Sequence, residues 1–117
     1  MAYFEGQPGV DVQMLDAALE DRQVLMPPPV LTELLSDPNL PAAVADGLTQ
    51  LPLIEVTDGF WHRAGILRAQ VLAKRRKARL GDALIAQSCL DRDILLLTRD
   101  RDFKTFAAAA DLRLAVE

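Results

Sequence analysis

The sequence predicts one α/β domain in which a mainly parallel sheet is flanked by helices. Segments with apolar residues at helical spacing alternate with short apolar runs of strand length. Residues 94–97 form a continuous apolar run, Ile-Leu-Leu-Leu, typical of strands buried on both faces. The 117 residues are 50% hydrophobic, which suits one domain with a single core.

The first half of the chain divides at its prolines. Asp11 is a favoured helix cap, and Pro28 and Pro29 suit the first turn of a helix. The expected helices are residues 12–19, 28–35 and 40–48, and the expected strands are residues 23–26 and 53–56.

The second half continues the alternation. Asp58 is expected to cap a long helix that runs into the basic residues 74–79, and Gly81 is expected to break it. The later elements are a helix at residues 82–90, a strand at 94–97, a turn with a short helix at 100–106 and a final strand at 112–116.

Composition excludes several classes of protein. The net charge is −4, which argues against a general basic nucleic-acid coat but not against one local basic patch. One cysteine, Cys89, and one histidine cannot supply an intrachain disulfide or a usual zinc ligand set. Cys89 falls in an apolar helical pattern, so we expect a buried thiol without a catalytic role. Without a visible secretory signal or membrane-spanning run, the expected location is the cytoplasm.

Three acids stand at unusual places. Glu33 lies among leucines, Asp82 opens a helix, and Asp100 follows the apolar strand at its carboxyl end. Singly, each has an ordinary interpretation as a solvent-facing, helix-start or turn residue. Together, at the ends of elements in an α/β chain, they indicate carboxylates that converge on one site. Clustered carboxylates favour Mg²⁺ or Mn²⁺, which suits a metal-dependent nuclease.

Two stretches resemble the PIN domain family. They are Gly-Asp-Ala-Leu-Ile-Ala at residues 81–86 with Ile-Leu-Leu-Leu-Thr-Arg-Asp-Arg-Asp-Phe at residues 94–103, and Pro-Val-Leu-Thr-Glu-Leu-Leu at residues 29–35. The resemblance covers essentially the whole chain, and the Thr-x-Asp-x-Asp-Phe ending is its most specific part.

The resemblance implies a three-layer, Rossmann-like α/β/α sandwich and a Mg²⁺- or Mn²⁺-dependent endoribonuclease site. Glu33, Asp82 and Asp100 would be the catalytic and metal-binding acids, with Asp102 as a further metal ligand. Thr98 would orient a carboxylate or a water. The small size is similar to VapC-type toxins, which are commonly homodimers and are inhibited by a cognate antitoxin.

The start of the chain departs from the family pattern. The family opens with a strand that ends in a metal-binding Asp, whereas residues 1–6 are similar to the helix that normally follows this strand. We therefore expect the first strand and its Asp to be absent, either because the chain is truncated at its N-terminus or because it is a degenerate relative.

Five basic residues precede Asp82. Their functional interpretation is an RNA clamp, and the plainer one is a solvated helix end. They are Lys74, Arg75, Arg76, Lys77 and Arg79. Trp61 is expected to pack in the core or in a dimer, with base stacking as the alternative.

Three functions remain open at this point. The first is a PIN-type endoribonuclease toxin that hydrolyses RNA phosphodiester bonds. The second is a catalytically degenerate module that binds an antitoxin or RNA without cleavage. The third is a phosphotransfer or phosphatase domain, although the sequence lacks an Asp-x-Asp after an N-terminal strand.

Overall fold

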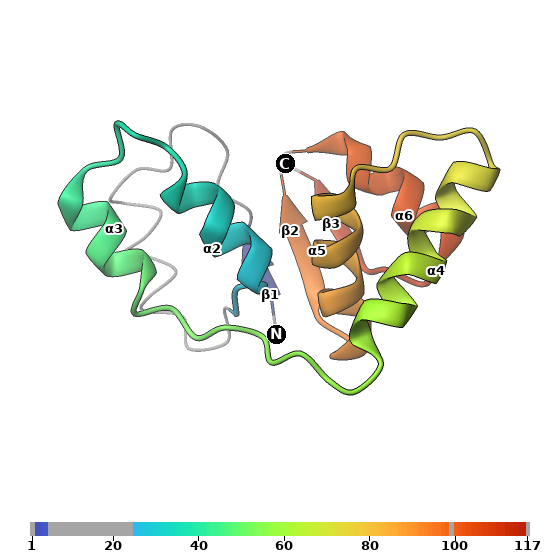
Figure 1. The fold of residues 1–117 in the computed structure, drawn as a ribbon, viewed down its shortest axis with the longest axis horizontal. Helices are drawn as coiled ribbons and strands as arrows, with labels where there is room; N and C mark the ends of the chain where they lie inside the picture. The colour runs from blue at the N-terminus through green and yellow to red at the C-terminus, as the bar shows by residue number, and fades with distance from the viewer. Residues whose placement is uncertain (1, 5–24, 99, 117) are drawn as a thin grey trace.

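The computed structural model describes residues 2–4, 25–98 and 100–116 (Figure 1). Helices α2 and α3 lie at one end of the molecule, α4 and α6 lie at the other, and α5 stands between them in front of the strands. The elements are β1 (Ala2–Phe4), α2 (Pro28–Leu35), α3 (Ala42–Leu48), α4 (Phe60–Ala73), α5 (Leu80–Asp91), β2 (Leu95–Thr98), the 3₁₀ helix η1 (Arg101–Phe103), α6 (Lys104–Ala109) and β3 (Leu114–Val116). These elements confirm the α/β prediction.

The sheet is parallel, and β2 lies at its centre. β1 pairs with β2 through Ala2↔Leu95, and β2 pairs with β3 through Leu97↔Ala115. Leu96 has no exposed surface, as expected for a central strand of a parallel sheet.

The expected absence of a first strand is wrong for residues 2–4. They form β1 and not the start of a helix. Tyr3 and Phe4 have high strand propensity, and an exposed edge of β2 would leave its backbone groups unpaired. Glu5 follows β1 in the sequence and lies outside the described residues, so the missing metal-binding Asp stays a prediction. The expected helix at residues 12–19 also lies outside them.

The two other expected strands are reduced to one contact. Met26 and Leu53 form an isolated parallel bridge, with Met26 N–H donating to the Pro52 carbonyl at 2.9 Å and Ile54 N–H donating to the Met26 carbonyl at 2.8 Å. Prolines on both sides limit further pairing, because proline has no N–H to donate.

Helix boundaries correct three expectations. Gly59, with a φ of 80°, caps α4 in place of Asp58, because a side chain at position 59 would meet the Arg63 guanidinium at 2.8 Å. α4 ends at Ala73, and Arg75 follows with a left-handed φ of 58°. The basic segment is therefore a loop and not a helix end, and Gly81 lies inside α5.

The core forms around α5, which packs against α4, α2 and β2. Its buried residues include Ile85 and Cys89, and Phe103 and Phe106 are buried behind it. Burial raises the pKa of the Cys89 thiol to about 12, in line with the expected non-catalytic thiol. Trp61 is 67% exposed, so its expected core position is wrong. Within the described ranges, no helix has both the length and the apolar character needed to cross a membrane.

Candidate metal centre

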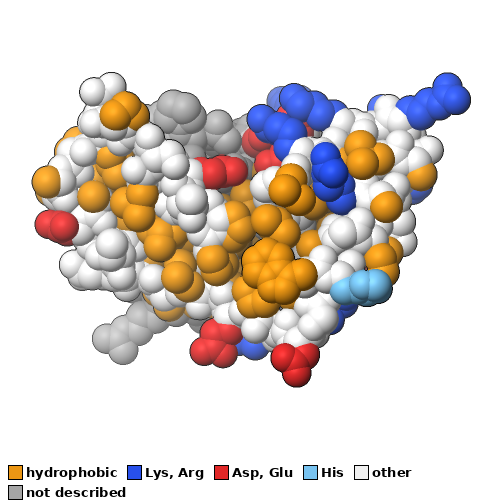
Figure 2. Space-filling view, viewed as in Figure 1, with side chains coloured by type: hydrophobic (Ala, Val, Ile, Leu, Met, Phe, Trp, Pro, Cys, Tyr) orange, Lys and Arg blue, Asp and Glu red, His pale blue; other side chains and the backbone are white. Residues whose placement is uncertain are grey.

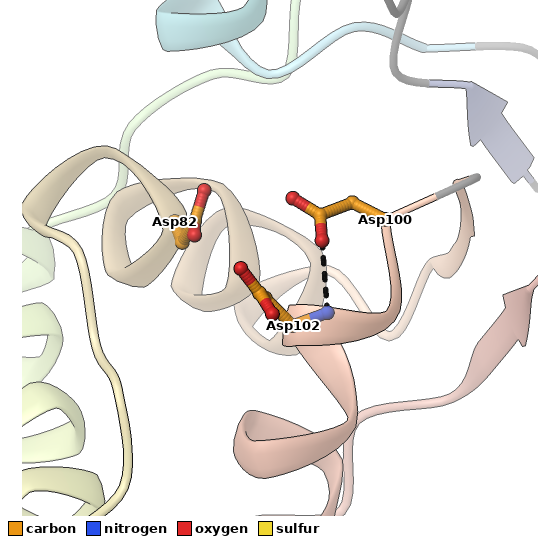
Figure 3. A group of neighbouring side chains, drawn as sticks. All are labelled: Asp82, Asp100 and Asp102. Atoms are coloured by element: carbon orange, nitrogen blue, oxygen red, sulfur yellow. Dashed lines mark hydrogen bonds between the residues drawn. The ribbon is translucent and has the colours of Figure 1, made fainter.

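Three aspartates converge where α5 begins and β2 ends. Asp82 lies in the first turn of α5, Asp100 comes two residues after β2, and Asp102 lies in η1. One carboxylate oxygen from each lies within 4.8 Å of the other two. Figure 3 shows the three side chains directed toward one another. Asp82 is buried, and Asp100 and Asp102 are partly buried.

The turn after β2 is fixed by its own hydrogen bonds. The buried Thr98 hydroxyl accepts the Asp100 N–H at 3.0 Å. The Asp100 Oδ1 accepts the Asp102 N–H at 2.8 Å and so caps η1 (Figure 3). Thr98 therefore positions Asp100 through its backbone, and Asp100 keeps its Oδ2 directed toward the cluster.

Two cations from the preceding loop neutralise part of this charge. Arg79 Nε donates to Asp82 Oδ2 at 3.1 Å, and its Nη2 contacts Asp100 Oδ2 at 3.1 Å and Asp102 Oδ2 at 3.3 Å. Lys77 Nζ lies 3.3 Å from Asp102 Oδ2. The described cluster thus holds three carboxylates and two cations.

The pKa of Asp82 is raised mainly by its burial. Asp100 and Asp102 add to the rise, although Arg79 opposes it. The Arg79 guanidinium has a raised pKa, first because of the charge of Asp82. A divalent cation would remove the repulsion among the carboxylates.

Glu33 lies beside this cluster without belonging to it. Its side chain is exposed on α2, and its Oε1 lies 3.1 Å from the point where a Cβ on Gly81 would stand. Gly81 thus allows α2 and the first turn of α5 to approach closely. Glu33 is outside the group of three acids whose oxygens lie within 4.8 Å, so the structure brings it near but does not join it to them.

The basic loop divides into two parts. Lys77 and Arg79 bind the acids. Lys74, Arg75 and Arg76 are exposed. In Figure 2, basic and acidic side chains gather at the top of the view, where α5 begins in Figure 1. The sequence left an RNA clamp and a solvated helix end as alternatives for residues 74–79. It did not predict the ion pairs, which the three-residue spacing of Arg79 and Asp82 could have indicated.

An apolar groove was also missed from the sequence. It has a volume of about 400 Å³ and extends from Pro28 and Glu33 on α2 to Trp61 on α4 and Leu84 on α5. Hydrophobic side chains spread across the middle of this face in Figure 2. The groove places an exposed aromatic side chain and Glu33 on the same surface.

The family assignment rests on a match over most of the chain. The PIN domain family model matches residues 1–109. The chain belongs to the PIN domain family. No curated protein matches the sequence closely.

Solved structures share this PIN fold. VapBC-5 from Mycobacterium tuberculosis, described as a member of the VapBC family of toxin–antitoxin systems, has a TM-score of 0.70 and 21% identity over 99% of this chain and 98% of that chain. VapBC2 from Rickettsia felis, bound to a promoter DNA fragment, has a TM-score of 0.70 and 20% identity over the same shares. FitAcB from Neisseria gonorrhoeae has a TM-score of 0.62 and 15% identity over 97% of this chain and 96% of that chain.

Proposed function

We propose that this PIN domain is a metal-dependent endoribonuclease and the toxin of a toxin–antitoxin pair. The observation that carries the proposal is the convergence of Asp82, Asp100 and Asp102 at the carboxyl end of the central strand β2. This is the edge at which parallel α/β sheets place their sites. PIN domains are generally nucleases, and metal-dependent hydrolysis of a phosphodiester uses carboxylates gathered in this way.

The donor set fits a hard divalent cation. Three carboxylates with oxygens within 4.8 Å of one another offer the ligands that Mg²⁺ and Mn²⁺ prefer. When bound, the cation would lower the pKa of the attacking water and neutralise charge on the phosphodiester. We assign Asp82 and Asp100 as ligands, Asp102 as a further ligand, and Glu33 as a catalytic acid that lies beside the cluster on α2 and approaches it when the metal binds. Thr98 holds Asp100 in place.

The exposed part of the basic loop suits the RNA backbone. Lys74, Arg75 and Arg76 are exposed in the loop that leads to Lys77 and Arg79, and their charge is local in a chain of net charge −4. Phosphate contacts from such residues release counterions and give sequence-independent affinity. Arg79 and Lys77 join this set once they leave the carboxylates.

The proposed partner is an antitoxin protein. The structural neighbours are described as toxin–antitoxin assemblies, and the apolar groove beside Glu33 offers this chain a surface for a protein partner. We also propose a homodimer in the cytoplasm.

The alternative is a degenerate PIN module that binds an antitoxin or RNA without cleavage. The metal separates the two functions, because a working nuclease site binds Mn²⁺ and a degenerate one does not. The intact cluster of three aspartates favours the nuclease.

The decisive experiment is cleavage of a structured RNA with Mn²⁺ or with chelator. The wild-type chain is compared with Asp82→Asn and with Asp111→Asn, which removes an exposed carboxylate outside the cluster. We expect Mn²⁺-dependent cleavage, an approximately 100-fold or larger loss in Asp82→Asn, and no loss in Asp111→Asn. Cleavage that persists in chelator or in Asp82→Asn contradicts the proposal.

A second arm measures Mn²⁺ binding by the same three proteins without RNA. If the wild-type chain neither cleaves RNA nor binds Mn²⁺, the degenerate module replaces the nuclease.

A further inference from the structure

Arg79 contacts all three aspartates of the cluster at once. Its Nε binds Asp82 Oδ2, and its Nη2 binds both Asp100 Oδ2 and Asp102 Oδ2. The guanidinium presents its donors in a rigid planar fork, so one side chain can bridge several carboxylates. Among the described residues, Arg79 is the cation paired with Asp82.

The local backbone directs Arg79 toward these acids. Arg79 is the N-cap residue of α5 with an extended ψ of 148°, and its carbonyl accepts the Ala83 N–H at 3.1 Å. The adjacent Ala78 is buried, and its carbonyl accepts a hydrogen bond from Arg68 at 2.9 Å. The main chain of Arg79 is thus held at the start of α5, and its partly exposed side chain is held by its contacts with the three aspartates.

A divalent cation would need the same oxygens. Ligand oxygens approach Mg²⁺ to about 2.0–2.1 Å, whereas the Arg79 nitrogens stand 3.1 to 3.3 Å from the three Oδ2 atoms. The guanidinium and the cation cannot both occupy the centre of the cluster. Because 55% of the Arg79 side chain is already exposed, its guanidinium can turn outward into water while the main chain stays in place.

We infer that Arg79 is a resident counter-cation of the acidic cluster, which competes with the divalent metal and must leave the carboxylates before the metal binds. The inference rests on the proposed metal site. In the metal-free protein, Arg79 relieves repulsion among Asp82, Asp100 and Asp102. It thereby raises the metal concentration at which the site fills, an inhibitory contact made within the chain itself. After displacement, its guanidinium stands beside the site with the geometry that phosphate oxygens favour.

The test is Mn²⁺ affinity, measured from the electron paramagnetic resonance signal of free Mn²⁺ in the absence of RNA. The variants are Arg79→Gln, which removes the competitor, and Arg79→Lys, which keeps the charge without the fork. The matched control is Arg101→Gln. Arg101 lies between Asp100 and Asp102 in the sequence, is exposed, and forms no ion pair within the described part of the chain.

We expect Arg79→Gln to bind Mn²⁺ about tenfold more tightly than the wild type, because a charge-assisted contact no longer has to be broken. The Mn²⁺ affinity of Arg79→Lys should lie between those of the wild type and Arg79→Gln. Arg101→Gln should tighten binding only two- to threefold, roughly the effect of one nearby solvated charge. Melting temperatures measured with and without Mn²⁺ provide a second readout, with the largest Mn²⁺-induced rise in Arg79→Gln.

Two results overturn the inference. If Arg79→Gln binds Mn²⁺ no more tightly than Arg101→Gln, Arg79 does not compete with the metal, and the proposed function survives. If neither the wild type nor any variant binds Mn²⁺, the proposed metal site fails together with the inference.

Discussion

The two ends of α5 each pair a nearly buried aspartate with an arginine, and the pairs differ in charge balance. At the C-terminal end, Arg63 forms a fork on Asp91, with Nε 3.0 Å from Oδ1 and Nη2 2.7 Å from Oδ2. Gln87 donates to Asp91 Oδ1 at 2.7 Å, and Thr57 donates to Oδ2 at 3.3 Å. This carboxylate has a complete set of neutralising partners.

At the N-terminal end, one arginine forms ion pairs with three carboxylates. Arg79 shares its contacts among Asp82, Asp100 and Asp102, and only Lys77 adds a second cation within the described residues. Burial would raise the pKa of Asp91, but hydrogen bonds from Arg63 and Gln87 make the net shift downward. Burial raises the pKa of Asp82, and Arg79 does not reverse the shift. The C-terminal end holds one aspartate in an ion pair, whereas at the N-terminal end the carboxylates outnumber the cations among the described residues.

The largest expected effect on stability is at the C-terminal end of α5, where Arg63 pairs with Asp91. Asp91→Asn should lower the free energy of unfolding by about 1–3 kcal/mol, because Arg63 loses its charged acceptor in a partly buried place. Thermal unfolding should show a melting temperature about 4–12 °C lower.

Asp93→Asn is the matched control for this variant. Asp93 is paired with Arg113, its side chain is 87% exposed, and its left-handed φ of 50° is one that Asn tolerates. A change of less than about 0.5 kcal/mol is expected there. An equal loss in both variants would contradict the special role of the Asp91 pair.

Lowering the pH should also remove the stabilisation that the Asp91 carboxylate provides. The pKa of Asp91 is lower in the folded state, so its stabilising effect is complete above the unfolded value of about 3.9 and is lost as pH falls through the folded value. Between about pH 5 and pH 2, the wild type should therefore lose more stability than Asp91→Asn. The free energy of unfolding is measured at each pH by denaturant titration. An equal loss of stability in the two proteins as the pH falls would contradict the lowered pKa of Asp91.

The smallest effect on stability is expected at the N-terminal end of α5, where the loss of Asp82 should stabilise the fold. A raised folded-state pKa means that the contribution of Asp82 is present below the unfolded pKa and lost as pH rises through the folded value. At neutral pH, without metal, Asp82→Asn should raise the free energy of unfolding by up to about 1 kcal/mol. A clear loss of stability would instead identify Arg79–Asp82 as a stabilising ion pair.

The sequence predicted the elements that local patterns determine. Pro28 and Pro29 begin α2, the apolar run contains β2, and Asp82 and Asp100 converge because helix starts and strand ends meet at one edge of a parallel sheet. These features depend on proline geometry, periodicity and connection rules, which a single sequence displays. Asp102, which only the family resemblance indicated, joins Asp82 and Asp100 in place of Glu33.

The rest depends on tertiary contacts. Gly59 replaces Asp58 as the cap of α4 because Arg63 requires the space beside it. Residues 2–4 form β1 because they pair with β2, although residues 1–6 resemble a helix in the family pattern. The contacts of Arg79 with Asp100 and Asp102, and the separation of Glu33 from the cluster, follow from how α2, α5 and the turn after β2 pack, which no local pattern encodes.

The most direct test of the account compares Mn²⁺ binding by Asp82→Asn and Asp91→Asn. Both variants replace an arginine-paired aspartate on the same helix with its neutral isostere, and both are measured well below their melting temperatures. The account predicts that Asp82→Asn weakens Mn²⁺ binding by about tenfold or more and that Asp91→Asn leaves it unchanged. Equal affinities in the wild type and Asp82→Asn would contradict the claim that the charge imbalance at the start of α5 forms a metal site.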